Sequence, residues 1–313
     1  MLRRVAFTLS AACLTVSLSG CGSWFDTEER EPWRAAAEQQ CLSAGFVQET
    51  ADIRISEAIE GPGVCGLDHP FKVSAFEGVT PFGPSNSLVP MAYDANSGLT
   101  PPGDVDGSMP LQPEASFPSA DPSGMGQTGP APFRVSVSRT ETMSCAMIPA
   151  TTRWLAEHVQ PAALAHFGVR VAEMKTAGAY NCRRRNHARS GRWSEHAFAN
   201  ALDVSGFVLE DGRKTNIGSG WRGSAEEQAF WRDIAYGGCG LFNTVLGPGS
   251  DGRHENHLHL DLARHSAKRN LHVCRPRVPA GFVPVAQRFA PAGTAAPEFT
   301  GSIVEPKDAD NDF

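Results

Sequence analysis

The chain has 313 residues, of which 41% are hydrophobic and 20% charged, and its formal net charge is −6 at pH 7. A chain of this length can form one large domain or two small ones with a core of their own. The acidic balance argues against a nucleic-acid partner, because chains that bind nucleic acid carry a basic surplus. We therefore expect a soluble globular protein that does not bind nucleic acid.

Residues 1–20 have the pattern of a secretory signal. A basic start is followed by the apolar run Val5–Leu18, which is too short for an ordinary membrane span. The run ends in Leu18–Ser–Gly–Cys21, which resembles the lipobox of bacterial lipoproteins. This resemblance implies cleavage before Cys21, acylation of that cysteine as a membrane anchor and, with glycine at position 22, a place in the outer membrane facing the periplasm. The alternative is a plain cleaved signal with an unmodified Cys21.

Periodic and capping patterns predict the elements of an α+β fold. Three segments have helical patterns: Pro32–Gln40, Thr151–Phe167 with a bend at Pro161, and a helix that a Ser224–Glu227 capping box opens and that runs to about Tyr236. Four segments have strand patterns: residues 71–76, residues 169–180, a hairpin over 202–217 that turns at Asp211–Gly212, and residues 257–262.

Proline content divides the chain after the signal. Residues 81–133 contain eleven of the 23 prolines, five acidic residues and no lysine or arginine. This composition favours a flexible insertion, because it offers little apolar surface to bury. Residues 134–274 contain three prolines and nine of the ten histidines. We predict a catalytic-type domain over 134–274, joined across the insertion to residues 21–80 and followed by a disordered tail over 275–313.

Six cysteines remain after the predicted signal and anchor are set aside. Their number is even, no two form a C-x-x-C pair, and an exported protein meets an oxidising environment. These features favour three disulfides over a cysteine zinc site. Nearness in sequence predicts the pairs Cys41–Cys65, Cys145–Cys182 and Cys239–Cys274.

Two short segments contain residues that can bind a metal ion. The first holds His196 and Asp203, which a loop-to-strand transition or two helical turns would bring together. The second, His254–Glu–Asn–His257–Leu–His259, places His257 and His259 on one face of a strand. Nitrogen and oxygen donors of this kind suit Zn²⁺ in a three-ligand site with an open fourth position, where a bound water becomes acidic enough for hydrolysis.

The pattern Ser194-x-His196-(x)6-Asp203 followed by His257-x-His259 resembles the lysostaphin-type, D-Ala-D-Ala-metallopeptidase and murein-endopeptidase group of zinc peptidases. More closely, residues 194–207 and Ala179–Arg183 resemble the bacterial extensin-like C-terminal domain, over about residues 140–274 together with the Cys65–Gly66 segment. The resemblance implies a small antiparallel sheet with flanking helices, a fold like that of the D-Ala-D-Ala peptidases and Hedgehog, braced by disulfides.

Carried over position by position, the resemblance implies roles for eight residues. His196, Asp203 and His259 would be the zinc ligands. His257 would act as general base or polarise the water, and His254 matches a further histidine of the murein-endopeptidase pattern. Arg183 would stabilise the oxyanion, while Ser194 and Tyr180 would orient a ligand or the substrate.

One position departs from the pattern of the D-Ala-D-Ala enzymes. They carry a glutamate base three residues before the last ligand, where this chain has Asn256, and the neighbouring Glu255 would point to the opposite face of a strand. Either His257 accepts the proton or the site binds metal with little catalysis. We thus predict a lipid-anchored zinc peptidase acting on peptidoglycan stem peptides. The alternative is a non-catalytic envelope lipoprotein that binds the cell wall or a partner through the same fold.

Overall fold

The computed structural model describes residues 29–79, 132–266, 271–276, 282 and 285. The predicted signal, the anchor Cys21, nearly all of the predicted insertion over 81–133 and most of the predicted tail over 275–313 lie outside these residues. Within the described part, no helix combines the length and apolar character needed to cross a membrane.

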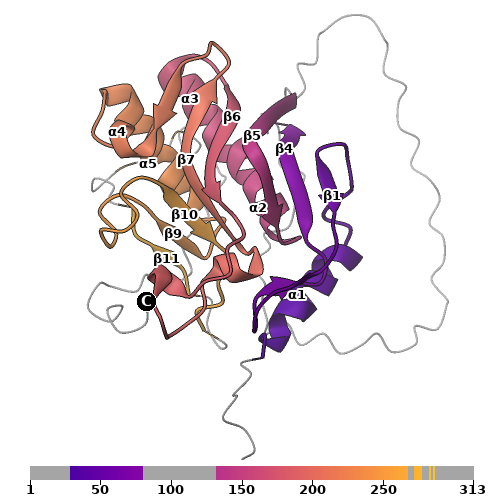
Figure 1. Cartoon of the computed structure of the whole chain (residues 1–313). Helices are drawn as coiled ribbons and strands as arrows, with labels where there is room; N and C mark the ends of the chain where they lie inside the picture. The colour runs from indigo at the N-terminus through magenta and orange to yellow at the C-terminus, as the bar shows by residue number, and fades with distance from the viewer. Residues whose placement is uncertain (1–28, 80–131, 267–270, 277–281, 283–284, 286–313) are drawn as a thin grey trace, which may run out of the picture.

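A mixed sheet of nine strands forms the centre of the molecule (Figure 1). In spatial order the strands are β1 (Ile53–Ile55), β4 (Phe71–Val79), β5 (Pro132–Met143), β6 (Val171–Gly178), β7 (Ala201–Leu209), β10 (Leu258–Asp261), β9 (Thr244–Leu246) and β11 (Val273–Cys274), and β8 (Lys214–Asn216) pairs with β7. β5–β6 and β9–β11 are parallel pairs and the other pairs are antiparallel. A separate pair is formed by β2 (Ile59–Glu60) and β3 (Gly66–Leu67).

The expected small antiparallel sheet is therefore wrong in size and in strand direction. Alternation of apolar residues marks a strand, but it does not tell which strand lies next to it. The short strands β9 and β11 are also too brief to show a pattern of their own. The broader prediction of an α+β fold braced by disulfides is confirmed.

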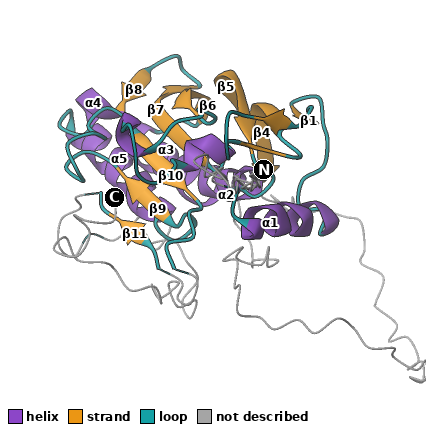
Figure 2. Ribbon diagram, turned by 60° about the horizontal axis from the view of Figure 1, so that its bottom comes forward, coloured by secondary structure: helices purple, strands orange, loops and turns teal. Residues whose placement is uncertain are grey.

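The helices are α1 (Pro32–Ser43), α2 (Met147–Trp154), the π-helical turn η1 (Leu155–Val159), α3 (Gln160–Phe167), the 3-10 turns η2 (Arg185–His187) and η3 (Glu195–Phe198), α4 (Ile217–Gly220) and α5 (Ala225–Gly238). Helices α2, α3 and α5 cover one face of the sheet, whereas α1 lies apart from α3–α5, on the side of β1 and β4 (Figures 1 and 2). The predicted capping box is present, because Ser224 and Glu227 exchange side-chain and backbone hydrogen bonds at the start of α5.

The segment predicted as one helix with a bend at Pro161 contains a π-helical turn instead. Pro161 is the second residue of α3, which begins directly after η1. Proline has no backbone N–H that could donate to a carbonyl of the preceding turn. That turn can therefore widen into the π form without breaking a hydrogen bond at this position. Trp154, the last residue of α2 before this turn, is fully buried, and its indole Nε1 donates to the Ile234 carbonyl of α5 at 2.8 Å.

Alternation along the central strands separates the core from the opposite face of the sheet. Leu202 and Val204 of β7 and Leu258 and Leu260 of β10 belong to the apolar core beneath the helices. Because successive side chains of a strand point to opposite faces, the residues between them face away from that core. These residues are the polar ones: Asp203, His259 and Asp261.

Three disulfides connect the described parts of the chain. Cys41 of α1 pairs with Cys145 after β5, Cys65 pairs with Cys182, and Cys239 pairs with Cys274. The predicted pair Cys239–Cys274 is thus present, whereas the predicted pairs Cys41–Cys65 and Cys145–Cys182 are wrong. Nearness in sequence does not predict these pairs, because β4 pairs with β5 and α1 packs near η3. Cys41 and Cys65 therefore lie beside segments that are more than a hundred residues away in the chain.

Stability is expected to fall as the pH is lowered, through the buried imidazole of His158. Burial lowers the pKa of His158 to about 4, and its Nδ1 has no hydrogen-bond partner among the described residues. The ring fills the space beside Gly237, where an added Cβ would lie 2.3 Å from it. A histidine whose folded pKa lies below its unfolded value stabilises the fold above the unfolded pKa, and this contribution is lost as the pH falls toward the folded pKa. Between about pH 7.5 and pH 5 the expected loss is about 2 kcal/mol.

Urea unfolding of the wild type and of His158→Gln at both pH values measures this loss. The variant should lose less free energy of unfolding on acidification than the wild type does, because glutamine does not titrate. His187→Asn, at an exposed turn with φ +56° that asparagine tolerates, is the matched control. Equal pH slopes for the wild type and His158→Gln would contradict the assignment.

Candidate metal centre

The centre of the site is set by the register of two neighbouring strands. β10 runs antiparallel to β7 so that His259 lies directly opposite Asp203. Residues opposite each other on an antiparallel pair have their Cβ atoms about 5 Å apart, which brings the imidazole and the carboxylate together. On the other side of β7, Gly178 of β6 also lies opposite Asp203, so the adjoining Ala179 borders the same place.

His196 reaches this place from the turn before β7. Ser194 is the N-cap of η3, and its hydroxyl accepts a hydrogen bond from the backbone N–H of His196. Ala199 ends the turn in the left-handed region at φ +49°, and β7 begins two residues later. Of the two routes that the sequence allowed between His196 and Asp203, the structure uses the loop-to-strand transition.

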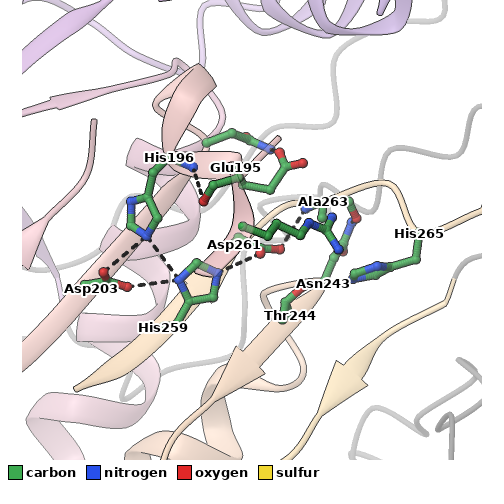
Figure 3. Close-up of polar contacts among 12 residues, drawn as sticks. Glu195, His196, Asp203, Asn243, Thr244, His259, Asp261, Ala263 and His265 are labelled. Carbon is green, nitrogen blue, oxygen red and sulfur yellow. Dashed lines mark hydrogen bonds and ion pairs between the residues drawn. The ribbon is translucent and has the colours of Figure 1, made fainter. Parts of the chain in front are cut away.

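Three ligand atoms converge at this point, as Figure 3 shows. His196 Nε2 lies 3.2 Å from His259 Nδ1 and 3.2 Å from Asp203 Oδ2, and His259 Nδ1 lies 2.9 Å from Asp203 Oδ1. Tetrahedral zinc with bonds of 2.0–2.1 Å holds its ligand atoms roughly 3.3 Å apart. The His196–Asp203–His259 cluster therefore has the donor types and the spacing that a tetrahedral ion requires.

The outer nitrogens of the two imidazoles are fixed by acceptors. His196 Nδ1 donates to the carbonyl of Ala179 at 3.0 Å, and His259 Nε2 donates to the carboxylate of Asp261 at 2.8 Å. With a metal ion bound, each outer nitrogen would keep its proton and each inner nitrogen would present its lone pair to the ion. Outer partners of this kind are the usual support of metal-binding histidines.

The charges of the cluster also favour a cation. Burial disfavours the ionised form of Asp203, but hydrogen bonds with His196 and His259 outweigh burial and hold its pKa well below the usual range. Burial likewise opposes charge on His259, yet its contacts with Asp203 and Asp261 raise its pKa to about 10. Two buried carboxylates thus share one pair of imidazoles, and a divalent ion would balance their charge.

His257 and His254 lie next to the cluster. His257 Nε2 is 3.7 Å from Asp203 Oδ1, and its Nδ1 donates to the Asn256 side chain at 2.8 Å, which leaves Nε2 with its lone pair. The His254 ring lies 5.0 Å from the His257 ring and 5.6 Å from that of His259, and its Nδ1 donates to Asp251. Burial lowers the pKa of both residues. Four imidazoles therefore gather here.

Glu255 does not belong to this group. It precedes β10 rather than lying on it, and its carboxylate accepts from the backbone N–H of Gly249 at 2.8 Å. Its other carboxylate oxygen lies 3.8 Å from Arg222 Nη2. The prediction that Glu255 points away from the ligands is correct, but the reason given for it, strand alternation, is wrong. Glu255 points away because it lies in the turn before β10.

The other predicted site residues lie on the segments that hold His196 in place. Tyr180 follows Ala179, the acceptor of His196, and burial raises the pKa of its phenol. The carbonyl of Arg183 accepts from the N–H of Ser194 at 3.1 Å, while the Arg183 side-chain Nε is shielded and has no acceptor among the residues that the structure covers. Ser194 is buried and uses its hydroxyl to cap η3.

Sequence reasoning missed the residues that support the ligands. Asp261 lies two residues after His259 on the same strand face, so strand alternation could have indicated it. Arg34 of α1 could not have been found in this way. Its guanidinium forms a bidentate ion pair with Glu195 at 2.7 and 2.8 Å, both side chains are nearly inaccessible, and Phe198 stacks on the cation at 3.7 Å. Helix α1 thereby holds the turn that carries His196.

If the cluster holds a metal ion such as zinc, Asp261→Asn is expected to weaken its binding by about 10- to 100-fold, because an amide no longer polarises and orients the His259 ring as a carboxylate does. Competition with a chromophoric zinc chelator measures the affinity. Asp211→Asn, on the exposed hairpin turn, removes the same charge and should leave the affinity unchanged. An affinity of Asp261→Asn within twofold of the wild type would show that this carboxylate does not support the ligand.

Comparison with known proteins identifies one family. Residues 123–275, just under half of the chain, match the family described as Extensin-like protein C-terminus. The match supports the predicted extensin-like family for the region that contains the three ligand residues. No curated protein and no solved structure matches the chain.

Proposed function

We propose that the extensin-like region is a zinc-dependent hydrolase that cleaves peptide amide bonds of peptidoglycan, in a lipoprotein anchored through Cys21. The observation that carries the proposal is the convergence of His196 Nε2, His259 Nδ1 and an Asp203 oxygen, each within 3.2 Å of another. Bound there, zinc would supply a Lewis acid and bring the pKa of a coordinated water to about 7. Three protein ligands leave a fourth position for that water.

The chain's own groups fit the remaining steps of amide hydrolysis. His257 presents an unprotonated Nε2 beside Asp203, held in this tautomer by Asn256, and we assign it the proton of the attacking water. The same imidazole can return that proton to the leaving amine. Asp261 and Ala179 hold the two ligand imidazoles in place. We assign Arg183 to the developing oxyanion, following the resemblance to the D-Ala-D-Ala enzymes.

Metal content and digestion of purified sacculi test the proposal together. The purified protein should hold about one zinc per chain by inductively coupled plasma analysis, and it should release new muropeptides with free amino groups, detected by mass spectrometry. Chelation should stop the release and added zinc should restore it. Absence of bound zinc at neutral pH, or an unchanged muropeptide profile, would reject the proposal.

His257→Ala separates hydrolysis from metal binding alone. If His257 is the base, the rate of muropeptide release should fall at least 100-fold while the zinc content stays at wild-type level. The second candidate function, a non-catalytic envelope protein that binds the wall, is favoured by Asn256, which stands where the D-Ala-D-Ala enzymes have glutamate. That candidate predicts full zinc occupancy, binding to sacculi and no muropeptide release from either protein.

A further inference from the structure

A second concave site lies outside the metal cluster. An open cavity of about 320 Å³ separates α4 and α5 from the loop between β9 and β10. It is lined by Trp221, Arg222, Gln228, Arg232, Pro248 and Gly249. The charged side chains among these lining residues are both cations, in a chain whose net charge is negative.

Arg232 is the inner cation of the cavity. Its Nη1 donates to Gln228 Oε1 at 3.0 Å, one helical turn earlier on α5, and its guanidinium lies 5.5 Å from the Trp221 ring centroid. Within the part of the chain that the structure describes, its Nε is shielded from solvent and has no acceptor. A shielded donor without an acceptor costs free energy, which a ligand oxygen bound to the same guanidinium would offset.

Arg222 is the outer cation. Its side chain is 81% exposed, and its ion pair with Glu255 is long, at 3.8 Å. The second oxygen of Glu255 is already engaged by the N–H of Gly249. The cavity and its edge therefore hold two guanidinium charges against one carboxylate, which leaves a surplus of one positive charge for a bound anion.

We propose that this cavity binds a small organic carboxylate, whose oxygens pair with Arg222 and Arg232. Guanidinium groups bind carboxylates with two parallel hydrogen bonds. A monoanion matches the surplus of one charge better than a phosphate dianion does.

Isothermal titration with N-acetylalanine tests the site in the full mature chain. We expect a Kd on the order of 1 mM or below, no binding of the neutral N-acetylalaninamide, and weaker binding of inorganic phosphate. Arg222→Gln and Arg232→Gln should each weaken binding at least about tenfold, because each removes a charged hydrogen-bond donor. Arg54→Gln, on β1 at the far edge of the sheet, loses the same charge and should bind as the wild type does.

Titrations of both the chelator-treated and the zinc-loaded protein keep this test independent of the proposed hydrolase. Binding that needs zinc and ignores both arginine variants would place the ligand at the metal and overturn the proposal. Equal binding of the amide, or tighter binding of phosphate, would overturn the ligand class. Because Arg222 is exposed, its variant decides the matter even if Arg232→Gln folds poorly.

Discussion

His259→Ala should reduce the zinc content from about one ion per chain to background and abolish muropeptide release. The substitution removes one of three protein ligands and at the same time leaves Asp261 buried without the imidazole that it holds. The two remaining donors, His196 and Asp203, cannot form the three-ligand site that retains zinc in a hydrolase. Inductively coupled plasma analysis of protein purified at neutral pH measures the effect.

Two further variants make this result specific. His196→Ala removes a ligand that comes from η3 instead of β10, and it should give the same loss. His187→Asn removes an exposed histidine of η2 and should keep its zinc. Near-stoichiometric zinc in both ligand variants would show that the ion, if present, is held elsewhere.

Arg34→Met should lower the free energy of unfolding by about 3 kcal/mol or more, because it leaves Glu195 buried without its cation. Asn200 would still donate to that carboxylate, at 2.7 Å. Because Glu195 adjoins His196 in η3, the variant should also bind zinc more weakly than the wild type. Urea unfolding and chelator competition measure the two effects.

A double variant and a surface pair serve as controls for this prediction. Arg34→Met combined with Glu195→Leu should be more stable than Arg34→Met alone, since no unpaired charge remains in the interior. Arg153→Met breaks a more accessible ion pair with Glu157 on one helix and should cost under about 1 kcal/mol. A cost for Arg34→Met no greater than that for Arg153→Met would contradict a structural role for the buried pair.

Local features of the fold could be predicted because the signal lies within a few residues. Ser224 and Glu227 form their capping box, and β7 and β8 meet in a hairpin at Asp211–Gly212. His196, Asp203 and His259 could be grouped because their types and spacings are those of a metal site. The structure places them around one point.

Features that depend on distant packing could not be predicted. No residue pattern near Cys41 indicates that α1 lies against the segment after β5, so Cys145 could not be predicted as the partner of Cys41. The same holds for Arg34, whose partner Glu195 is 161 residues away. Sheet order is of this kind too, because β5 and β6 are parallel neighbours separated by three helical segments.

Two of the disulfides have a consequence for how the chain responds to proteolytic nicking. Cys41–Cys145 and Cys65–Cys182 both connect residues before position 80 with residues after position 131. A single cut anywhere between those positions would therefore yield two polypeptides that migrate as one band without reductant and as two bands with it. Helix α1, whose Arg34 binds Glu195 beside His196, would stay covalently tethered to the strands that carry Asp203 and His259 after such a cut.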